Sequence, residues 1–391
     1  GSNDSGQLTG DRGSWSPDAW LPGEANLAGK TVSRIAAGES HSLALLADGS
    51  VVAWGDNTYG QLGDGTNTSS HTPVVVVPTG ALAGKTVIDV AAGASHSVAL
   101  CLDGTVVCWG HNQSGELGDG TFTDSNVPVA LFVSGALSGR SIKAIAAGGY
   151  HSLAVCSDGR IVAWGDNDSG DLGNGDTISR NRPVAVVRTG VLGGKMPIAV
   201  VAGKSHSLAL CSDNTIVAWG ANSVGQLGNG GMDFSTEPVL VSNEGLLAGQ
   251  KIVALAAGDA HNLAVLGDGG VVGWGSNYIG QLGIEELPYS LVPVAVNTAG
   301  VLSGKKVVVV AAGSFHSLAL CSDGTLTAWG YNGRGPLGDG TLTERYVPVV
   351  VGSTGVLSGK KVVRLAAGAG HSLALAAAPL SNNSVLTSLG L

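Results

Sequence analysis

Seven of the nine histidines stand at one fixed position of a repeated motif, and a ring of imidazoles could in principle bind a metal ion or an anion. The motif has the form A-A-G-x-x-H-[SN]-[LV]-A-[LV], with Val201 in place of the first alanine in one copy, and successive copies are 55 residues apart, at His41, His96, His151, His206, His261, His316 and His371. A metal site needs three or four ligands that converge on the ion, whereas one histidine per repeat spreads the ligands around a wide circle. We therefore expect imidazoles that tie each repeat to its neighbour, with no metal and no cofactor.

The five cysteines are a second candidate for chemistry. Cys101, Cys156, Cys211 and Cys321 occupy equivalent places in four repeats, and the fifth is Cys108. Counting outward from the Asp103-Gly104 turn pairs Cys101 with Val106 and Ala99 with Cys108, so no two cysteines face each other. Small buried hydrophobic side chains are the favoured interpretation over disulfide or metal chemistry, and the redox compartment stays open.

Signatures of catalysis are missing from the sequence. No G-x-S-x-G or H-E-x-x-H motif is present, and no residues break the repeat in the way that a catalytic pair in a repeated scaffold would. The stretch from Asp166 to Asp171 has the spacing of a calcium loop but lacks the closing glutamate. We expect a non-enzymatic protein, with a glycan-active hydrolase or lyase as a lower alternative.

Each repeat has the pattern of four short strands. In the second copy, apolar runs such as SHSVALC and TVVCWG flank Asp103-Gly104, a dipeptide that suits a tight hairpin turn, and VPVAL and SIKAIAAG follow. No segment shows helical spacing over ten residues, so the unit is predicted to be a four-stranded antiparallel meander. An asparagine after each Trp-Gly, such as Asn57, is expected to bind the loop backbone. The structural tryptophans recur at Trp54, Trp109, Trp164, Trp219, Trp274 and Trp329.

Such sheets cannot bury both faces alone, and radial packing covers them, which predicts a β-propeller. The sequence AAGxxHSLAL followed by DGxVxAWGxNxxGQLGDGT resembles the repeat of the regulator of chromosome condensation family. The resemblance implies an all-β, seven-bladed β-propeller of four-stranded antiparallel blades, and the GALAGKTV spacer is similar to that of bacterial members. The family's founding member is an exchange factor for a small GTPase that uses an inserted wedge. The uniform repeat leaves no room for a wedge, so exchange activity is only a lower alternative.

The two ends of the chain are predicted to share the last blade. Residues 1–8 match residues 110–117 in the middle of a repeat, whereas the last copy lacks an Asp-Gly turn and a Trp-Gly strand. We expect one propeller domain over residues 1–379, in which residues 1–23 complete the blade begun at 366–379. Residues 380–391 are either a closing strand or the start of a following domain.

Composition narrows the partners and the setting. The 391 residues are 44% hydrophobic and carry a net charge of −9 without a Lys/Arg-rich cluster, which argues against nucleic acid. No apolar run approaches the eighteen residues that span a bilayer. A monomer is expected, in a bacterial extracellular or cell-surface setting, with a cytoplasmic setting as the alternative.

Two loops in each repeat vary in sequence: the one before the histidine and the one after Trp-Gly. Both are odd-numbered connections of a meander and should share one side of the disc, which we call the variable-loop face. Its candidate binding residues are Tyr59, His111, Tyr150, Lys204, Asp259, Tyr278, Phe315, Tyr331 and Arg334. Exposed aromatic and arginine side chains are typical of recognition surfaces.

The predicted function is a recognition scaffold that binds a protein or a polymer such as a polysaccharide across this face. A proteinaceous enzyme inhibitor is the alternative. Two further interpretations stay open: Tyr150 and Phe315 could fill the central channel, and near-uniform repeats would also suit a scaffold whose only property is stability.

Overall fold

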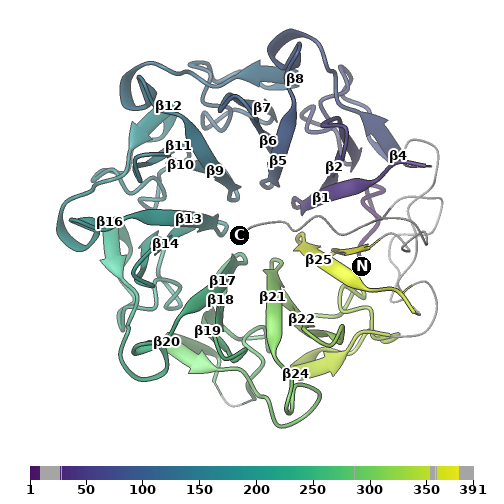
Figure 1. Cartoon of the computed structure of the whole chain (residues 1–391), viewed down its shortest axis with the longest axis vertical. Helices are drawn as coiled ribbons and strands as arrows, with labels where there is room; N and C mark the ends of the chain where they lie inside the picture. The colour runs from purple at the N-terminus through teal and green to yellow at the C-terminus, as the bar shows by residue number, and fades with distance from the viewer. Residues whose placement is uncertain (9–26, 28, 286, 353–356, 358, 378–391) are drawn as a thin grey trace, which may run out of the picture.

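Sheets arranged around a central axis make up the structure, a computed structural model that describes residues 1–8, 27, 29–285, 287–352, 357 and 359–377 (Figure 1). These residues contain six four-stranded antiparallel sheets and one two-stranded sheet. Each strand of a sheet pairs with the next along the chain, so the predicted meander is confirmed. The β-propeller with four-stranded antiparallel blades is therefore observed.

The strands occupy equivalent places in successive sheets. The innermost strands are β1 (Val32–Ala37), β5 (Val87–Ala92), β9 (Ile142–Ala147), β13 (Pro197–Ala202), β17 (Ile252–Ala257), β21 (Val307–Ala312) and β25 (Val362–Ala367). The second strands are β2 (His41–Leu46), β6 (His96–Cys101), β10 (His151–Cys156), β14 (His206–Cys211), β18 (His261–Leu266), β22 (His316–Cys321) and β26 (Ser372–Ala376).

The third and outermost strands complete six of the sheets. The third strands are β3 (Val51–Gly55), β7 (Val106–Gly110), β11 (Ile161–Gly165), β15 (Ile216–Gly220), β19 (Val271–Ser276) and β23 (Leu326–Gly330). The outermost strands are β4 (Ser70–Val75), β8 (Ser125–Ala130), β12 (Arg180–Ala185), β16 (Ser235–Leu240), β20 (Tyr289–Ala295) and β24 (Arg345–Val350). The described residues also contain four short 3₁₀ helices between sheets: η1 (Gly80–Leu82), η2 (Gly135–Leu137), η3 (Gly190–Leu192) and η4 (Gly245–Leu247).

The number of blades differs from the prediction. The described residues contain six four-stranded blades rather than seven, because the last repeat forms only the two-stranded sheet β25–β26. The Asp-Gly turn and the Trp-Gly segment of the repeat have no counterpart in the sequence after Ala376, and residues 378–391 lie outside the described part of the chain. The prediction of seven four-stranded blades is therefore wrong in its count.

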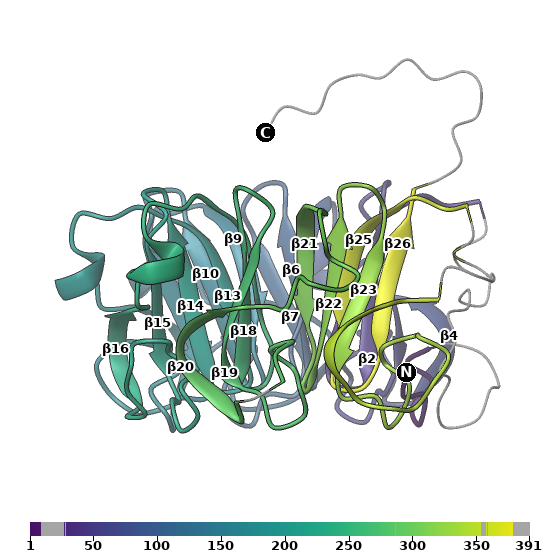
Figure 2. The same ribbon diagram turned by 90° about the horizontal axis from the view of Figure 1, so that it is seen from below.

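Residues 1–8 lie beside this incomplete sheet. The backbone N–H of Ser2 donates to the carbonyl of Gly370, and the amino group of Gly1 donates to the carbonyl of Gly335, 2.9 Å away. In the side view of Figure 2 these residues lie at the lower edge of the disc. Most of the segment predicted to complete the blade, residues 9–23, lies outside the described residues, as does the tail 380–391.

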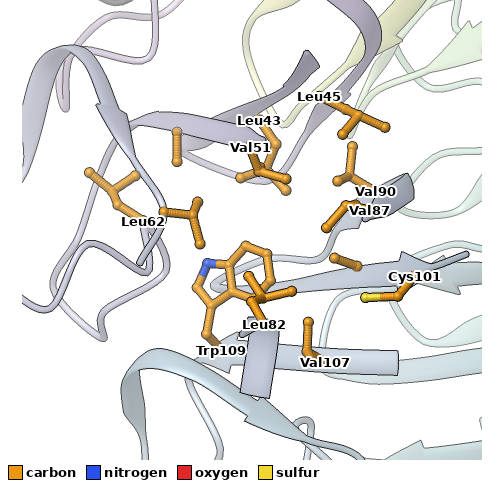
Figure 3. Close-up of a cluster of buried hydrophobic side chains, with 13 residues drawn as sticks. Leu43, Leu45, Val51, Leu62, Leu82, Val87, Val90, Cys101, Val107 and Trp109 are labelled. Carbon is orange, nitrogen blue, oxygen red and sulfur yellow. The ribbon is translucent and has the colours of Figure 1, made fainter. Parts of the chain in front are cut away.

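The core lies between neighbouring sheets. Figure 3 shows one such layer, in which Leu43, Val51 and Leu62 of the first blade meet Trp109 and Val107 of the second. Trp109 is completely buried. Because burial of apolar area stabilises each sheet only through its neighbour, a single blade of this protein would be unstable alone.

The cysteines lie within these layers. All five are buried and unpaired. The register corrects the expected pairing, because Ala99 lies opposite Val107, and Cys108 lies opposite Val98. The turn is longer than a two-residue hairpin: the N–H of Cys101 bonds to the carbonyl of Thr105, so the pairing shifts by one residue.

Candidate functional site

The seven repeated histidines form a ring of contacts between adjacent sheets. Nε2 of His41 lies 2.9 Å from Oγ of Ser97 in the next sheet, and the same contact recurs around the disc. The ring closes where His371 reaches Ser42, at 3.1 Å. The partner of each imidazole is thus a side chain of the neighbouring sheet.

The hydrogen-bond chain fixes the protonation of these imidazoles. Ser97 donates its single hydroxyl proton to the carbonyl of Gln61, so His41 must donate from Nε2. In the fourth blade, His206 faces Oδ1 of Asn262, which can only accept, while Nδ2 of Asn262 donates to the carbonyl of Gln226. The serine and the asparagine therefore accept the same proton.

Burial keeps the imidazoles neutral. It lowers the pKa of His41, His151, His261, His316 and His371 to about 3. Burial likewise lowers the pKa of His96 and His206 to about 4. Among the residues that the structure describes, no three His, Cys, Asp or Glu side chains are grouped to hold a metal ion.

The tryptophans share the carbonyls that the serines use. Nε1 of Trp109 donates to the carbonyl of Gln61 at 2.9 Å, and Trp54 makes the same bond to the carbonyl of Gln7. Residues 1–8 thus take the place of a loop that would belong to the incomplete sheet. Asn57 also holds its loop, because its side chain donates to Thr66 and Thr68 carbonyls and accepts from the N–H of Leu62.

A cavity of about 160 Å³ lies on the central axis at the variable-loop face. It is lined by the Ala-Gly segments of the repeats, with Glu39, Lys204 and Asp259 at its polar positions. Nζ of Lys204 lies 3.9 Å from Asp259, which also accepts from Ser314 at 2.9 Å. Burial raises the pKa of Asp259. Tyr150 and Phe315 are not part of the lining, so they do not fill this channel.

Three of the predicted binding residues form one aromatic cluster across three blades. The ring centroids of Tyr59 and His111 are 4.7 Å apart, and those of His111 and Tyr150 are 6.2 Å apart. Nδ1 of His111 lies 2.7 Å from Oε1 of Glu116, a hydrogen bond that raises the pKa of His111. Tyr150 remains 36% exposed. The cluster therefore presents an aromatic surface whose central ring is held by a hydrogen bond to the buried Glu116.

The remaining candidates lie apart from this cluster. Tyr278 is 60% exposed, and its ring lies 6.4 Å from that of Tyr289. Phe315 is 42% exposed, and Tyr331 is half-buried. Arg334 is paired with Asp4 of the N-terminal segment. The structure thus brings the predicted residues onto loops of one face but does not gather them in one pocket.

Sequence reasoning overlooked a pairing inside the second variable loop. In several blades the first residue after Trp-Gly contacts the residue five positions later, as in Asp56–Gln61 (2.6 Å) and Ser276–Gln281 (3.1 Å). The third blade instead places two carboxylates, Asp166 and Asp171, at these positions. The fixed five-residue interval was visible in the sequence, but nothing there showed that the two side chains meet.

Asp171 is the unusual member of this set. Its side chain is buried, and neither carboxylate oxygen has a hydrogen-bond partner among the described residues. Burial, followed by the nearby Asp166, raises the pKa of Asp171 to about 7. The backbone N–H of Ser169 lowers the pKa of Asp171 by a smaller amount, although its position does not meet the geometry of a hydrogen bond. The third blade therefore carries a buried carboxylate without the side-chain partner found in several other blades.

The fold and the repeated ring contacts define a propeller built from regulator of chromosome condensation repeats. The RCC1-like domain matches residues 1–244, and the RCC1 repeat matches residues 252–281 and 307–335, and in a second form residues 268–320 and 323–375. The chain belongs to the RCC1-like family.

Two relatives illustrate how much of a protein the chain covers. It is 34% identical to the Ultraviolet-B receptor UVR8 of Arabidopsis thaliana over 83% of this chain and 71% of the receptor. It is 33% identical to the human E3 ubiquitin-protein ligase HERC2 over 98% of this chain but only 8% of the ligase. Both are eukaryotic, and they give the bacterial assignment no support.

Solved structures share the fold. Prp20p from Saccharomyces cerevisiae superposes with a TM-score of 0.84 at 23% identity, covering 97% of this chain and 91% of that one. Human WBSCR16 superposes with a TM-score of 0.78 at 24% identity, covering 95% of this chain and 94% of that one. In the described part of the chain, no helix has the length and apolar character needed to cross a membrane.

Proposed function

We propose that this chain is a protein-binding propeller that acts through its variable-loop face and performs no catalysis itself. The observation that carries the proposal is the exposure of three aromatic side chains on loops of this face: Tyr150 (36%), Tyr278 (60%) and Phe315 (42%). Aromatic side chains on a rigid support give large contact area at low entropic cost, so they anchor protein interfaces.

The polar residues among the candidate binding residues support a binding role rather than a catalytic one. Lys204 and Asp259 contact each other, His111 is held by Glu116, and Arg334 is paired with Asp4. Each group is thus committed to a partner within the chain, whereas a general acid or base must be able to reach a substrate. A solved structure of similar fold, yeast RCC1 (Prp20), is described as bound to the protein Kap60.

A direct test uses a random-peptide library displayed on phage and selected on the immobilised full chain. Recovered peptides are then titrated against the triple variant Tyr150→Ala, Tyr278→Ala and Phe315→Ala. We expect at least a tenfold loss of affinity, about 1.4 kcal/mol, with a melting temperature within about 2 °C of the parent.

The matched control removes three exposed apolar side chains from the opposite face: Leu102 (70% exposed), Val133 (64%) and Met196 (45%), each changed to Ala. Its affinity should stay within about twofold of the parent. The proposal would be overturned if the two variants lost affinity equally, or if the recovered peptides bound both variants as tightly as the parent. A polysaccharide array and a nucleotide-release assay with a small GTPase, in which we expect no response, test the polymer and exchange-factor alternatives.

An enzyme inhibitor would use the same face in the same way and differ only in the identity of the bound protein. The extracellular or cell-surface setting stays a prediction, and fractionation of the source cells followed by immunoblotting would test it.

A further inference from the structure

Charge is distributed unequally between the two faces of the disc. In the described loops of the variable-loop face, every loop that follows Trp-Gly contains at least one carboxylate, such as Asp64, Asp119 or Asp233. Across the same described loops, Lys204 and Arg334 are the only lysine or arginine residues. The face is therefore strongly acidic.

Most cations near this face are paired with carboxylates, whereas Arg182 lies over the ring of Phe132 and has no ion pair with the described residues. Lys204 contacts Asp259, Arg334 contacts Asp4, and Arg345 at the start of β24 contacts Asp339 at 2.8 Å. By contrast, the side chains of Asp168, Asp233 and Glu344 are exposed and make no hydrogen bond or ion pair with the described residues. An excess of negative charge remains for a partner to neutralise.

The opposite face is balanced. There four of the six described hairpin-turn aspartates pair with lysine or arginine from the adjoining connection, as in Lys195–Asp213 and Lys305–Asp323, both at 2.5 Å. The other two, Asp48 and Asp268, have no ion pair with the described residues. Further lysines, including Lys251 and Lys361, add positive charge on that side. The molecule therefore has an electrostatic polarity along the axis of the disc, which would orient an incoming charged partner.

Exposed apolar side chains accompany the acidic ones. Phe122 (55% exposed), Ile178 (63%) and Phe234 (57%) stand in the loops after Trp-Gly of three consecutive blades. Each lies within three residues of a carboxylate of its own loop. A complementary ligand must therefore offer both positive charge and apolar side chains, a combination typical of proteins and not of nucleic acids or anionic membranes.

The Asp166–Asp171 pair gives this surface a specific anchor. The equivalent pairs in the other blades include Ser2–Gln7, in which a donor meets an acceptor. In the third blade, both members are carboxylates, and neither oxygen of the buried Asp171 has a hydrogen-bond partner among the residues that the structure describes. A cationic group beside the half-exposed Asp166 would supply the missing opposite charge.

We propose, on the basis of the proposed protein-binding function, that the variable-loop face recognises a positively charged protein segment with apolar side chains. A lysine or arginine of that segment docks at the Asp166–Asp171 pair. The acidic loops attract the segment, and the exposed side chains of Phe122, Ile178 and Phe234 hold its apolar residues.

The experiment uses three synthetic fifteen-residue peptides that share the same Leu and Tyr positions, with Lys, Ser or Glu between them. Binding to the full chain is measured by fluorescence anisotropy at low and moderate salt. We expect the Lys peptide to bind at least tenfold more tightly than the Ser peptide, and the Glu peptide to show no binding. Added salt should weaken the Lys peptide most.

Site-specific binding is separated from general attraction by two charge-matched variants. One changes Asp168→Asn, Asp233→Asn and Glu344→Gln on the variable-loop face. The other changes Asp48→Asn, Glu244→Gln and Asp268→Asn, which lie exposed on the opposite face without an ion pair in the described structure. The first should weaken the Lys peptide at least fivefold and the second less than twofold. Equal effects would overturn the proposal.

The anchor is tested by Asp171→Gln, which restores the residue found in other blades. We expect at least threefold weaker binding of the Lys peptide together with unchanged or higher thermal stability, so a loss cannot be attributed to unfolding. Unchanged affinity would overturn the anchor.

The phage selection distinguishes the two proposals. Peptides that depend on the exposed aromatics but are neutral or acidic would overturn the charge assignment and leave the proposed function intact. If no recovered peptide depends on those aromatics, the proposed function itself fails.

Discussion

The histidine ring and the variable-loop face differ in how much their equivalent contacts vary from one repeat to the next. In the ring, each imidazole meets the equivalent side chain of the next sheet, and Asn262 in place of serine keeps the same donor and acceptor. In the loops, the equivalent pairs range from Asp56–Gln61 to His111–Glu116 and to Asp166–Asp171. Contacts that hold adjacent sheets together tolerate little change, whereas contacts within one loop can vary without disturbing the disc.

Acid should affect the ring most. Because the folded-state pKa of the ring histidines lies at about 3 or 4, below the ordinary histidine pKa of 6.5, the unfolded chain binds more protons between these values. Stability is then fully present above pH 6.5 and is lost as pH falls toward about 3, by up to roughly 1.4 kcal/mol per pH unit for each histidine. Urea unfolding from pH 7.5 to 4 measures this loss. A flat profile would contradict a neutral ring.

Removing one ring imidazole should give the next largest effect. In His151→Ala, Ser207 loses its buried partner and a cavity opens between two sheets, so we expect a loss of about 2–4 kcal/mol. Chemical denaturation measures it. The exposed His71, outside the ring, is the matched control, and His71→Ala should change stability by less than about 0.5 kcal/mol. Equal effects would show that the ring is not structural.

Asp171→Gln should stabilise the protein by about 1–3 kcal/mol above pH 7. The folded-state pKa of Asp171 is raised to about 7, so its protonated form favours folding below pH 3.8, and that contribution is lost as pH rises toward 7. The carboxylates of Asp166 and Asp168 also raise the pKa of Asp171, and both residues remain in the variant Asp171→Gln. The gain should shrink on going from pH 8 to pH 5, as measured by denaturant titration. A gain independent of pH would point to packing instead of charge.

Asn262→Ser should have the smallest effect, under about 1 kcal/mol, because the serine found in other blades performs the same two hydrogen bonds. Asn262→Ala removes both and should cost about 2 kcal/mol or more, as measured by the shift in the denaturation midpoint. If the two variants were equally destabilised, the equivalence between asparagine and serine in the ring would be wrong.

Much of the fold could be predicted from particular residues. The Asp103-Gly104 turn and the apolar runs beside it placed the hairpin, although the count outward from the turn was off by one residue because Cys101 and Thr105 close a wider turn. The exposure of Tyr150 and Phe315 could not be predicted, since it depends on how far they stand from the axis. The absence of a partner for Asp171 was equally hidden, because it depends on the space left by a side chain one methylene shorter than glutamate.

The sequence by itself determined the repeat, the order of four strands in a meander and the sharing of one face by the two variable loops. These follow from local chain geometry, since antiparallel neighbours must alternate their connections between two edges. Only the tertiary structure decided the histidine–serine contacts and the backbone hydrogen bond that joins Ser2 to Gly370. Those features join residues one repeat or more apart, such as His41 with Ser97 and Ser2 with Gly370, and depend on how each sheet packs against its neighbour.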